Sequence, residues 1–277
     1  MKINLISFSI LSALLLLVAG CSSDDDSTAR QAAVSKRTVS VSQLGFTSAD
    51  PVSRVSYSAA STSFTNNDAI GIYVVNSSGT LVDGMTNMKL TYNGTNWVDD
   101  SGNTYLNYIV AGKYFAYYPY SADMTAASVT VSGTTAADFF APAITARKAN
   151  IATDQSTLAK FTSYDLMVAM ASEAGGQITS TAFTFTFAHT MAMIEFQLAQ
   201  VSTSSVLKYT FTSHSLYNIS NGTYRMIVAP ETAITVNGDL YDGTYKSGTF
   251  TMTDAGLTAG YYKIFRDGNT EASLTTK

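Results

Sequence analysis

Residues suited to acid–base or metal chemistry are scarce in this chain, and none lies in a known catalytic pattern. Of the two histidines, His189 and His214, the first lies in the apolar stretch FTFTFAHTMAMIEF, which favours a satisfied histidine of the core or of a strand. The sequence has no Gly-x-Ser-x-Gly elbow, no His-Glu-x-x-His pair and no phosphate-binding glycine loop. Carboxylate pairs for glycoside hydrolysis need only proximity in space, so the sequence leaves them open. We expect no enzyme activity, no cofactor and no metal site.

Aromatic side chains are the other candidates for a binding site. The stretch KYFAYYPYS, residues 113–121, carries five aromatics in seven positions. The candidates for ligand stacking are Tyr114, Tyr118 and Tyr120, which share one face of a strand with Ala116, and Trp97, which follows a hairpin turn. They could form a platform for a sugar or a protein. Alternatively both faces of the strand are covered, with Pro119 marking its end, and we favour this packing role.

Composition limits the partners. The formal charge is −4, charged residues make up 13% of the chain, and no basic run is present to neutralise phosphates. We therefore expect no nucleic-acid partner.

The N-terminus has the pattern of a targeting segment. Lys2 is followed by an apolar run over residues 3–19, and small residues precede Cys21. The pattern predicts a signal peptide over residues 1–20, with a membrane-spanning helix or an ordinary signal with a chance cysteine as alternatives. It resembles the lipobox of bacterial lipoproteins, in which the cysteine, here Cys21, is lipidated. With Cys21 so used, the chain can form no internal disulfide and no cysteine-based metal site.

Residues 21–37 predict a flexible acidic tether. Acidic residues directly after the cysteine resemble the surface-export signal of lipoproteins in Bacteroidetes-type bacteria. The resemblance implies an outer-membrane lipoprotein precursor on the cell surface.

The elements that must position these residues are strands. The body is rich in Thr, Ser, Tyr, Phe and Val, and the pairs Asn93-Gly94 and Asn237-Gly238 are typical of hairpin turns. Short apolar runs between such turns, without long helical periodicity, predict an all-β sandwich protein. Only the segment 150–160 suggests a short helix or a long loop. A glycine-containing boundary at 172–176 predicts an N-terminal domain over 38–172 and a C-terminal domain over 176–277.

The stretch KRTVSVSQLGFTSADPVSR, residues 36–54, contains a predicted first strand over 38–46. Val39 and Val41 are in phase, as are Leu44 and Phe46, and a bulge at Ser42-Gln43 would bring both pairs to one inward face. Removal of such a strand would leave an apolar groove with unpaired backbone groups, a template for strand addition. The alternative is a permanent N-terminal strand.

Several short stretches together resemble the fimbrillin family, the subunits of lipoprotein-derived pili of Bacteroidales. They are SFTNNDAIGIYVV (63–75), KLTYNGTNWVDD (89–100), YFAYYPYS (114–121), SYDLMVA (163–169), FTFTFAHTMAMIEFQL (183–198), YRMIVAPE (224–231) and LTAGYY (257–262). The resemblance implies two transthyretin-like β-sandwich domains in tandem. It also implies cleavage after an arginine, loss of the first strand with its lipid, and entry of a strand from the next subunit.

In this sequence the implied cleavage site is Arg54, before Val55, since a cut at Arg37 would leave the strand in place. The tail RDGNTEASLTTK lacks the apolar alternation of a donor strand, which suggests a tip or accessory subunit. The implied partners are other pilin subunits and a host protein or glycan. The alternative is a monomeric outer-membrane lipoprotein that binds glycans or host proteins without polymerising.

Overall fold

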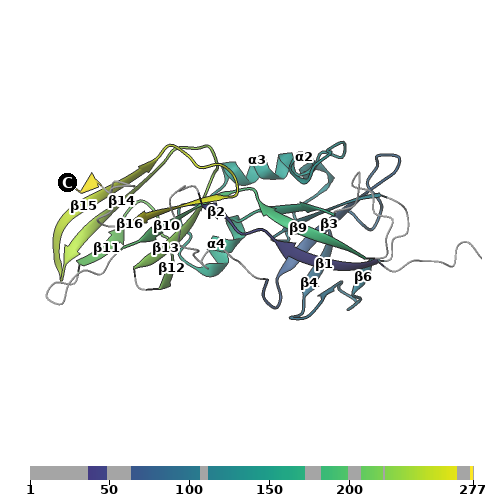
Figure 1. Ribbon diagram of the computed structural model, residues 1–277, viewed down its shortest axis with the longest axis horizontal. Coiled ribbons are helices and arrows are strands. Elements are labelled where there is room, and N and C mark those ends of the chain that lie inside the picture. The colour runs from purple at the N-terminus through teal and green to yellow at the C-terminus, as the bar shows by residue number, and fades with distance from the viewer. Residues whose placement is uncertain are drawn as a thin grey trace, which may run out of the picture. The chain divides into compact units, whose positions relative to one another are not determined.

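A computed structural model describes residues 37–48, 64–106, 112–171, 182–198, 207–220, 222–266 and 275–276. Within these ranges the chain forms three sheets and a few short helices (Figure 1). The predicted all-β class is confirmed. None of the helices in the described part is long and apolar enough to cross a membrane.

The first sheet has eight strands in the order β5-β4-β3-β7-β8-β9-β1-β6. The strands are, in that order, Trp97–Val98, Met88–Tyr92, Ala69–Asn76, Gly112–Tyr118, Met167–Met170, Ala182–His189, Arg37–Gln43 and Tyr105–Leu106. All their pairings are antiparallel except that of β1 with β9. The parallel pairing of β1 with β9 joins regions about 140 positions apart in the chain.

Alternation of side chains along these strands builds two cores, one on each face. On one face, apolar residues of β3 and β7 pack against Phe183, Phe185 and Phe187 of β9 and against the partly buried Val39 and Val41 of β1. The sheet thus packs on itself as a sandwich. On the other face, Tyr73, Phe115 and their neighbours form a second cluster. Strand β3 is buried on both faces, which explains its continuous apolar sequence.

Short helices supply the cover for the second face. They are η2 (Ala126–Ser128), α2 (Ala136–Phe139), α3 (Ala141–Ala149) and α4 (Leu158–Tyr164), and Figure 1 shows α2 and α3 above the strands of the first sheet. Thr135 caps α2, with its side chain accepting a hydrogen bond from the Asp138 backbone N–H. This start of the helix directs Phe139 onto Phe115, where the two rings stack with centroids 4.0 Å apart.

The remaining strands form two sheets that pack face to face around a third core. The five-stranded sheet has the order β12-β13-β10-β16-β2, with strands Tyr217–Ser220, Thr223–Val228, Ala192–Gln197, Tyr261–Arg266 and Thr47–Ser48. The four-stranded sheet has the order β11-β14-β15-β17, with strands Leu207–Phe211, Ile234–Asp242, Tyr245–Asp254 and Thr275–Thr276. Ile194 and Phe196 point into this core, whereas Met193 points into the cluster beneath the helices.

The predicted domain boundary at 172–176 lies outside the described residues. The strand β9, which follows that boundary, is hydrogen-bonded into the first sheet, and the chain changes sheets between His189 and Ala192. The reason is that Phe183, Phe185 and Phe187 complete the core of the first sandwich. The segment 150–160 is an eight-residue connection from Asn150 to Thr157 followed by the start of α4, so it combines both predicted alternatives.

One buried side chain ties this connection to the five-stranded sheet. Gln155 is fully buried, its Oε1 accepts from the Ile227 N–H at 2.8 Å, and its Nε2 donates to the Ile227 carbonyl at 2.8 Å. The side-chain amide therefore takes the place of a neighbouring strand at Ile227. It satisfies two backbone groups that would be costly to bury without partners.

Candidate functional site

The segment carrying the predicted first strand contacts both sandwiches. Strand β1 pairs with β9 from Thr38 to Gln43, and its first two residues also pair with β6. Further along, Thr47 and Ser48 of β2 pair in parallel with Tyr261 and Tyr262 of β16. Figure 1 shows β1 beside β9. Residues 37–48 therefore contribute backbone hydrogen bonds to two different sheets.

The side chains of β1 follow the predicted alternation in its first half. Val39 and Val41 pack against the first core, whereas Ser40 and Ser42 are exposed. The predicted bulge at Ser42-Gln43 is wrong, because the pairing with β9 continues without a register shift to Gln43. The Leu44 N–H still donates to the Phe187 carbonyl at 2.8 Å, but its side chain is 56% exposed. Leu44 is therefore not an inward residue.

Phe46 is the buried anchor of the segment. Its side chain is 6% exposed and stacks on the ring of His189, with centroids 3.7 Å apart and planes inclined by 18°. His189 Nδ1 lies 2.7 Å from Asp165 Oδ1. The interpretation of His189 as a satisfied core histidine is consistent with this pair at Nδ1, although its buried Nε2 has no hydrogen-bond partner among the described residues. Phe46 lies in the cluster beneath the helices, not in the core that holds Val39 and Val41.

Cys21, Arg54 and Val55 lie outside the described residues, so their lipidation and cleavage remain predictions.

The aromatic stretch packs on both of its faces. Tyr114 is fully buried and Trp97 is 6% exposed, so neither presents a ring for a ligand to stack on. Tyr118 is half-buried, and its hydroxyl donates to Asp68 Oδ1 at 2.9 Å. Strand β7 ends at Tyr118, before Pro119 as predicted. Tyr120 therefore leaves the face of Tyr114 and packs against the opposite cluster.

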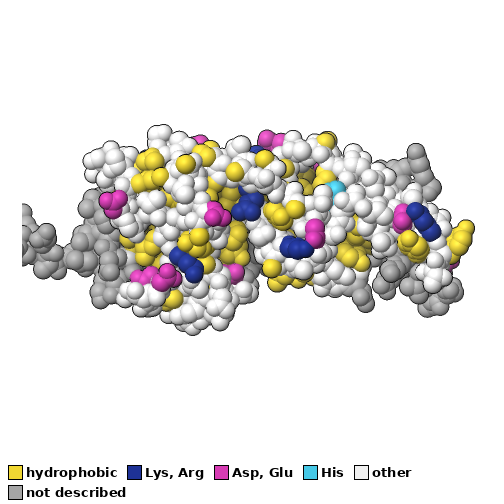
Figure 2. Space-filling model, turned by 180° about the vertical axis from the view of Figure 1, so that it is seen from behind, with side chains coloured by type: hydrophobic (Ala, Val, Ile, Leu, Met, Phe, Trp, Pro, Cys, Tyr) yellow, Lys and Arg dark blue, Asp and Glu magenta, His cyan; other side chains and the backbone are white. Residues whose placement is uncertain are grey.

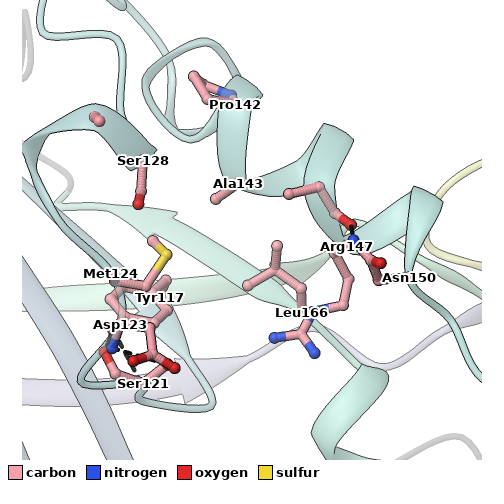
Figure 3. A pocket seen from close by; sticks show the side chains of 12 residues that line it. Tyr117, Ser121, Asp123, Met124, Ser128, Pro142, Ala143, Arg147, Asn150 and Leu166 are labelled. Atoms are coloured by element: carbon pink, nitrogen blue, oxygen red, sulfur yellow. Dashed lines mark hydrogen bonds between the residues drawn. The ribbon is translucent and has the colours of Figure 1, made fainter.

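A pocket that the sequence did not reveal lies between α3 and the loop that leads into η2 (Figure 3). Its volume is about 400 Å³. The apolar lining residues are Tyr117, Met124, Ala127, Pro142, Ala143, Ala146 and Leu166, and the polar ones are Ser121, Asp123, Ser128, Arg147 and Asn150. These residues come from β7, η2, α3 and the segments that connect elements, and they carry no local motif.

The loop side of the pocket is held by one network. Asn87 Nδ2 donates to the carbonyls of Ser121 and Met124, each at 2.9 Å. The Tyr117 hydroxyl lies 2.7 Å from Asn87 Oδ1 and accepts from the Ser121 N–H at 3.1 Å. Gly71 leaves room for this tyrosine, since a Cβ there would lie 2.1 Å from the Tyr117 ring. Burial raises the pKa of Tyr117 well above its usual range, so the hydroxyl stays protonated.

Arg147 is the cationic residue of the pocket. Figure 3 shows its side chain descending from the helix beside Leu166, across from Tyr117 and Met124. Nη1 donates to the Ser163 carbonyl at 2.6 Å. Burial lowers the pKa of the guanidinium, which nevertheless remains charged at neutral pH. No carboxylate of the described residues forms an ion pair with it.

A family model described as fimbrillin-like matches residues 53–260, which is most of the chain. The chain belongs to the fimbrillin-like family. The family predicted from the sequence is thus confirmed, and the matched region begins after the segment that holds β1 and β2.

This fimbrillin-like chain is similar to two proteins from Bacteroides ovatus with fimbrial names. The curated protein named "Putative fimbrium tip subunit Fim1C" from Bacteroides ovatus is 26% identical over 276 residues, covering 98% of this chain and 47% of that protein. The crystal structure of a fimbrial protein from Bacteroides ovatus ATCC 8483 has a TM-score of 0.62 at 23% identity, and it covers 84% of this chain and 49% of that one. The similarity to this crystal structure supports the fold. The chain spans about half the length of both proteins.

Proposed function

We propose that this fimbrillin-like chain is a subunit of a surface fimbrium, of tip or accessory type, which mediates adhesion and joins other subunits by strand exchange. Membership of the family and similarity to a protein named as a tip subunit support the fimbrial role. In this proposal the chain reaches the outer membrane as a lipoprotein anchored at Cys21. Cleavage between Arg54 and Val55 then removes the lipid together with the first strand.

The observation that carries the proposal is the placement of residues 37–48. Their attachment consists of backbone pairing with β9 and β16, two partly buried valines and the Phe46 ring. Removal of the segment would free the edge of β9 along six residues and uncover part of the first core. A strand from another subunit with matching alternation would restore both the backbone pairing and the apolar contacts.

The order of residues in the sequence favours Arg54 over Arg37 as the cleavage site. Arg54 follows both β1 and β2, so one cut after it releases the two strands together. Arg37 is the first residue of β1, and a cut after it would leave residues 38–48 attached through their pairing.

The tip or accessory role is supported by the similarity to a protein named as a tip subunit.

The test is the N-terminal sequence and intact mass of the protein recovered from its native cell surface. We expect a chain that starts at Val55 and carries no lipid. Arg54→Gln should prevent this processing and Arg37→Gln should leave it unchanged. Recovery of a chain that starts at lipidated Cys21 would overturn the maturation scheme and favour the alternative, a monomeric lipoprotein.

A further inference from the structure

We propose that the pocket beneath α3 binds a terminal hexuronic acid residue of a glycan, with Arg147 holding the sugar carboxylate. This adds a ligand class to the proposed role in adhesion. None of residues 37–48 lines the pocket, whose lining residues come from positions 117–166. Its occupation therefore does not require strand exchange.

The first argument is the charge of Arg147. The guanidinium has five N–H donors, and one of them is used by the Ser163 carbonyl. The guanidinium is partly buried and forms no ion pair among the described residues, and this partial desolvation disfavours its charge and lowers its pKa. A ligand carboxylate would accept two parallel hydrogen bonds from the planar guanidinium and neutralise the charge.

The second argument is the size and the floor of the pocket. A volume of about 400 Å³ lies within the usual range for small-ligand pockets. Leu166 and Met124 present apolar atoms to the interior, as Figure 3 shows. Such a floor suits the C–H face of a sugar ring. The network of Asn87, Tyr117 and Ser121 holds the loop wall in place before any ligand arrives, which reduces the entropy cost of binding.

The third argument is the rim, which distinguishes an acidic sugar from a fatty acid. Asp123 and Asn150 are exposed lining residues that offer a carboxylate and an amide to ligand hydroxyls. A hydrocarbon chain would form no hydrogen bond with either group. The pocket thus suits a polyhydroxylated ring whose carboxylate lies at Arg147.

The experiment is isothermal titration of the purified full chain with methyl β-D-glucuronide, in which the anomeric oxygen is blocked as it is in a glycan. Methyl β-D-glucoside is the matched control, because it replaces only the carboxylate with a hydroxymethyl group. We expect the glucuronide to bind at least about tenfold more tightly, corresponding to about 1.4 kcal/mol. Equal binding of the two glycosides, or no binding of the glucuronide, would overturn the proposal.

Variants locate the binding in the pocket. Arg147→Lys keeps the charge but loses the planar pair of donors, and we expect about tenfold weaker binding. Ala146→Phe fills the pocket from the exposed face of α3 without touching the bond to Ser163, and it should abolish binding. Lys148→Met removes a neighbouring charge that lines a different, smaller pocket and should have no effect. An equal loss in Lys148→Met, or unchanged affinity in Ala146→Phe, would place the sugar elsewhere.

The result of the glucuronide titration can be distinguished from the result of the maturation test. A chain that binds no glucuronide but is recovered with Val55 as its first residue would exclude the ligand and leave the fimbrial assembly intact. A chain that binds glucuronide and retains its lipid would support the ligand and overturn the maturation scheme.

Discussion

At the scale of single residues, two nearby apolar side chains of the N-terminal segment differ in their burial. Leu44 is mostly exposed, whereas Phe46 lies on His189 and is almost fully buried. His189 is itself held through its bond to Asp165, so the surface beneath Phe46 is firmly positioned. The attachment of the segment between β1 and β2 therefore depends on Phe46.

We expect Phe46→Ala to lower the free energy of unfolding by about 3 kcal/mol, because it removes a buried ring and leaves a cavity over His189. The matched control is Leu44→Ala, which should change the stability by no more than about 0.5 kcal/mol. Urea unfolding of the unprocessed protein, followed by circular dichroism, measures both. Equal effects of the two substitutions would show that the ring does not anchor the segment.

At the scale of elements, β1 is bound mostly through its backbone and only partly through its side chains. Parallel pairing with β9 supplies the hydrogen bonds, while Val39 and Val41 supply the contact with the core. Neither valine is fully buried. An element attached in this way can be exchanged for another strand of similar pattern, because backbone pairing is independent of sequence.

We expect processed protein that starts at Val55 to bind a synthetic peptide of residues 37–48. Val41→Asp in the peptide should weaken binding at least about tenfold, because it buries a carboxylate against apolar side chains. Ser40→Asp places the same charge on the exposed face and is the control. Fluorescence anisotropy of a labelled peptide gives the two affinities. The proposal that β1 is an exchangeable strand fails if the two substituted peptides bind equally well, or if no peptide binds.

At the scale of the whole molecule, aromatic side chains link the layers. The cluster beneath the helices joins β3 and β7 to residues of the five-stranded sheet such as Met193 and Ile227. On the face drawn in Figure 2, charged side chains form small separate groups of mixed sign. Burial within these clusters raises the pKa of Tyr73 to about 12 and shifts the pKa of Tyr118 upward as well.

This packing predicts sensitivity to alkaline pH. A tyrosine whose pKa is higher in the folded state contributes stability below its unfolded value of about 10, and this contribution is lost as the pH rises through the folded value. We expect unfolding to begin above pH 10 and the ultraviolet absorbance of tyrosinate from Tyr73 and Tyr118 to appear together with the loss of circular dichroism. Ionisation of every tyrosine near pH 10 in a still folded protein would contradict the expectation.

The family, the β class and the alternation of Val39 and Val41 could all be inferred from the sequence, because each depends on residue patterns within a few positions. The end of β7 at Pro119 is equally local, since proline supplies no N–H to a neighbouring strand. The path of the chain after Gln43 could not be inferred, because Leu44 and Phe46 are similar in local pattern. Contacts with His189, more than 140 positions away, separate them.

The pocket beneath α3 shows the same limit most clearly. Tyr117, Met124, Arg147 and Leu166 are spread over about 50 positions and have no shared spacing, and they meet because a helix covers the outer face of β7. In the sequence Arg147 resembles an ordinary helical surface cation. Its partial burial, without an ion pair among the described residues, arises only when the helix packs against the sheet, because desolvation depends on neighbours in space and not on neighbours along the chain.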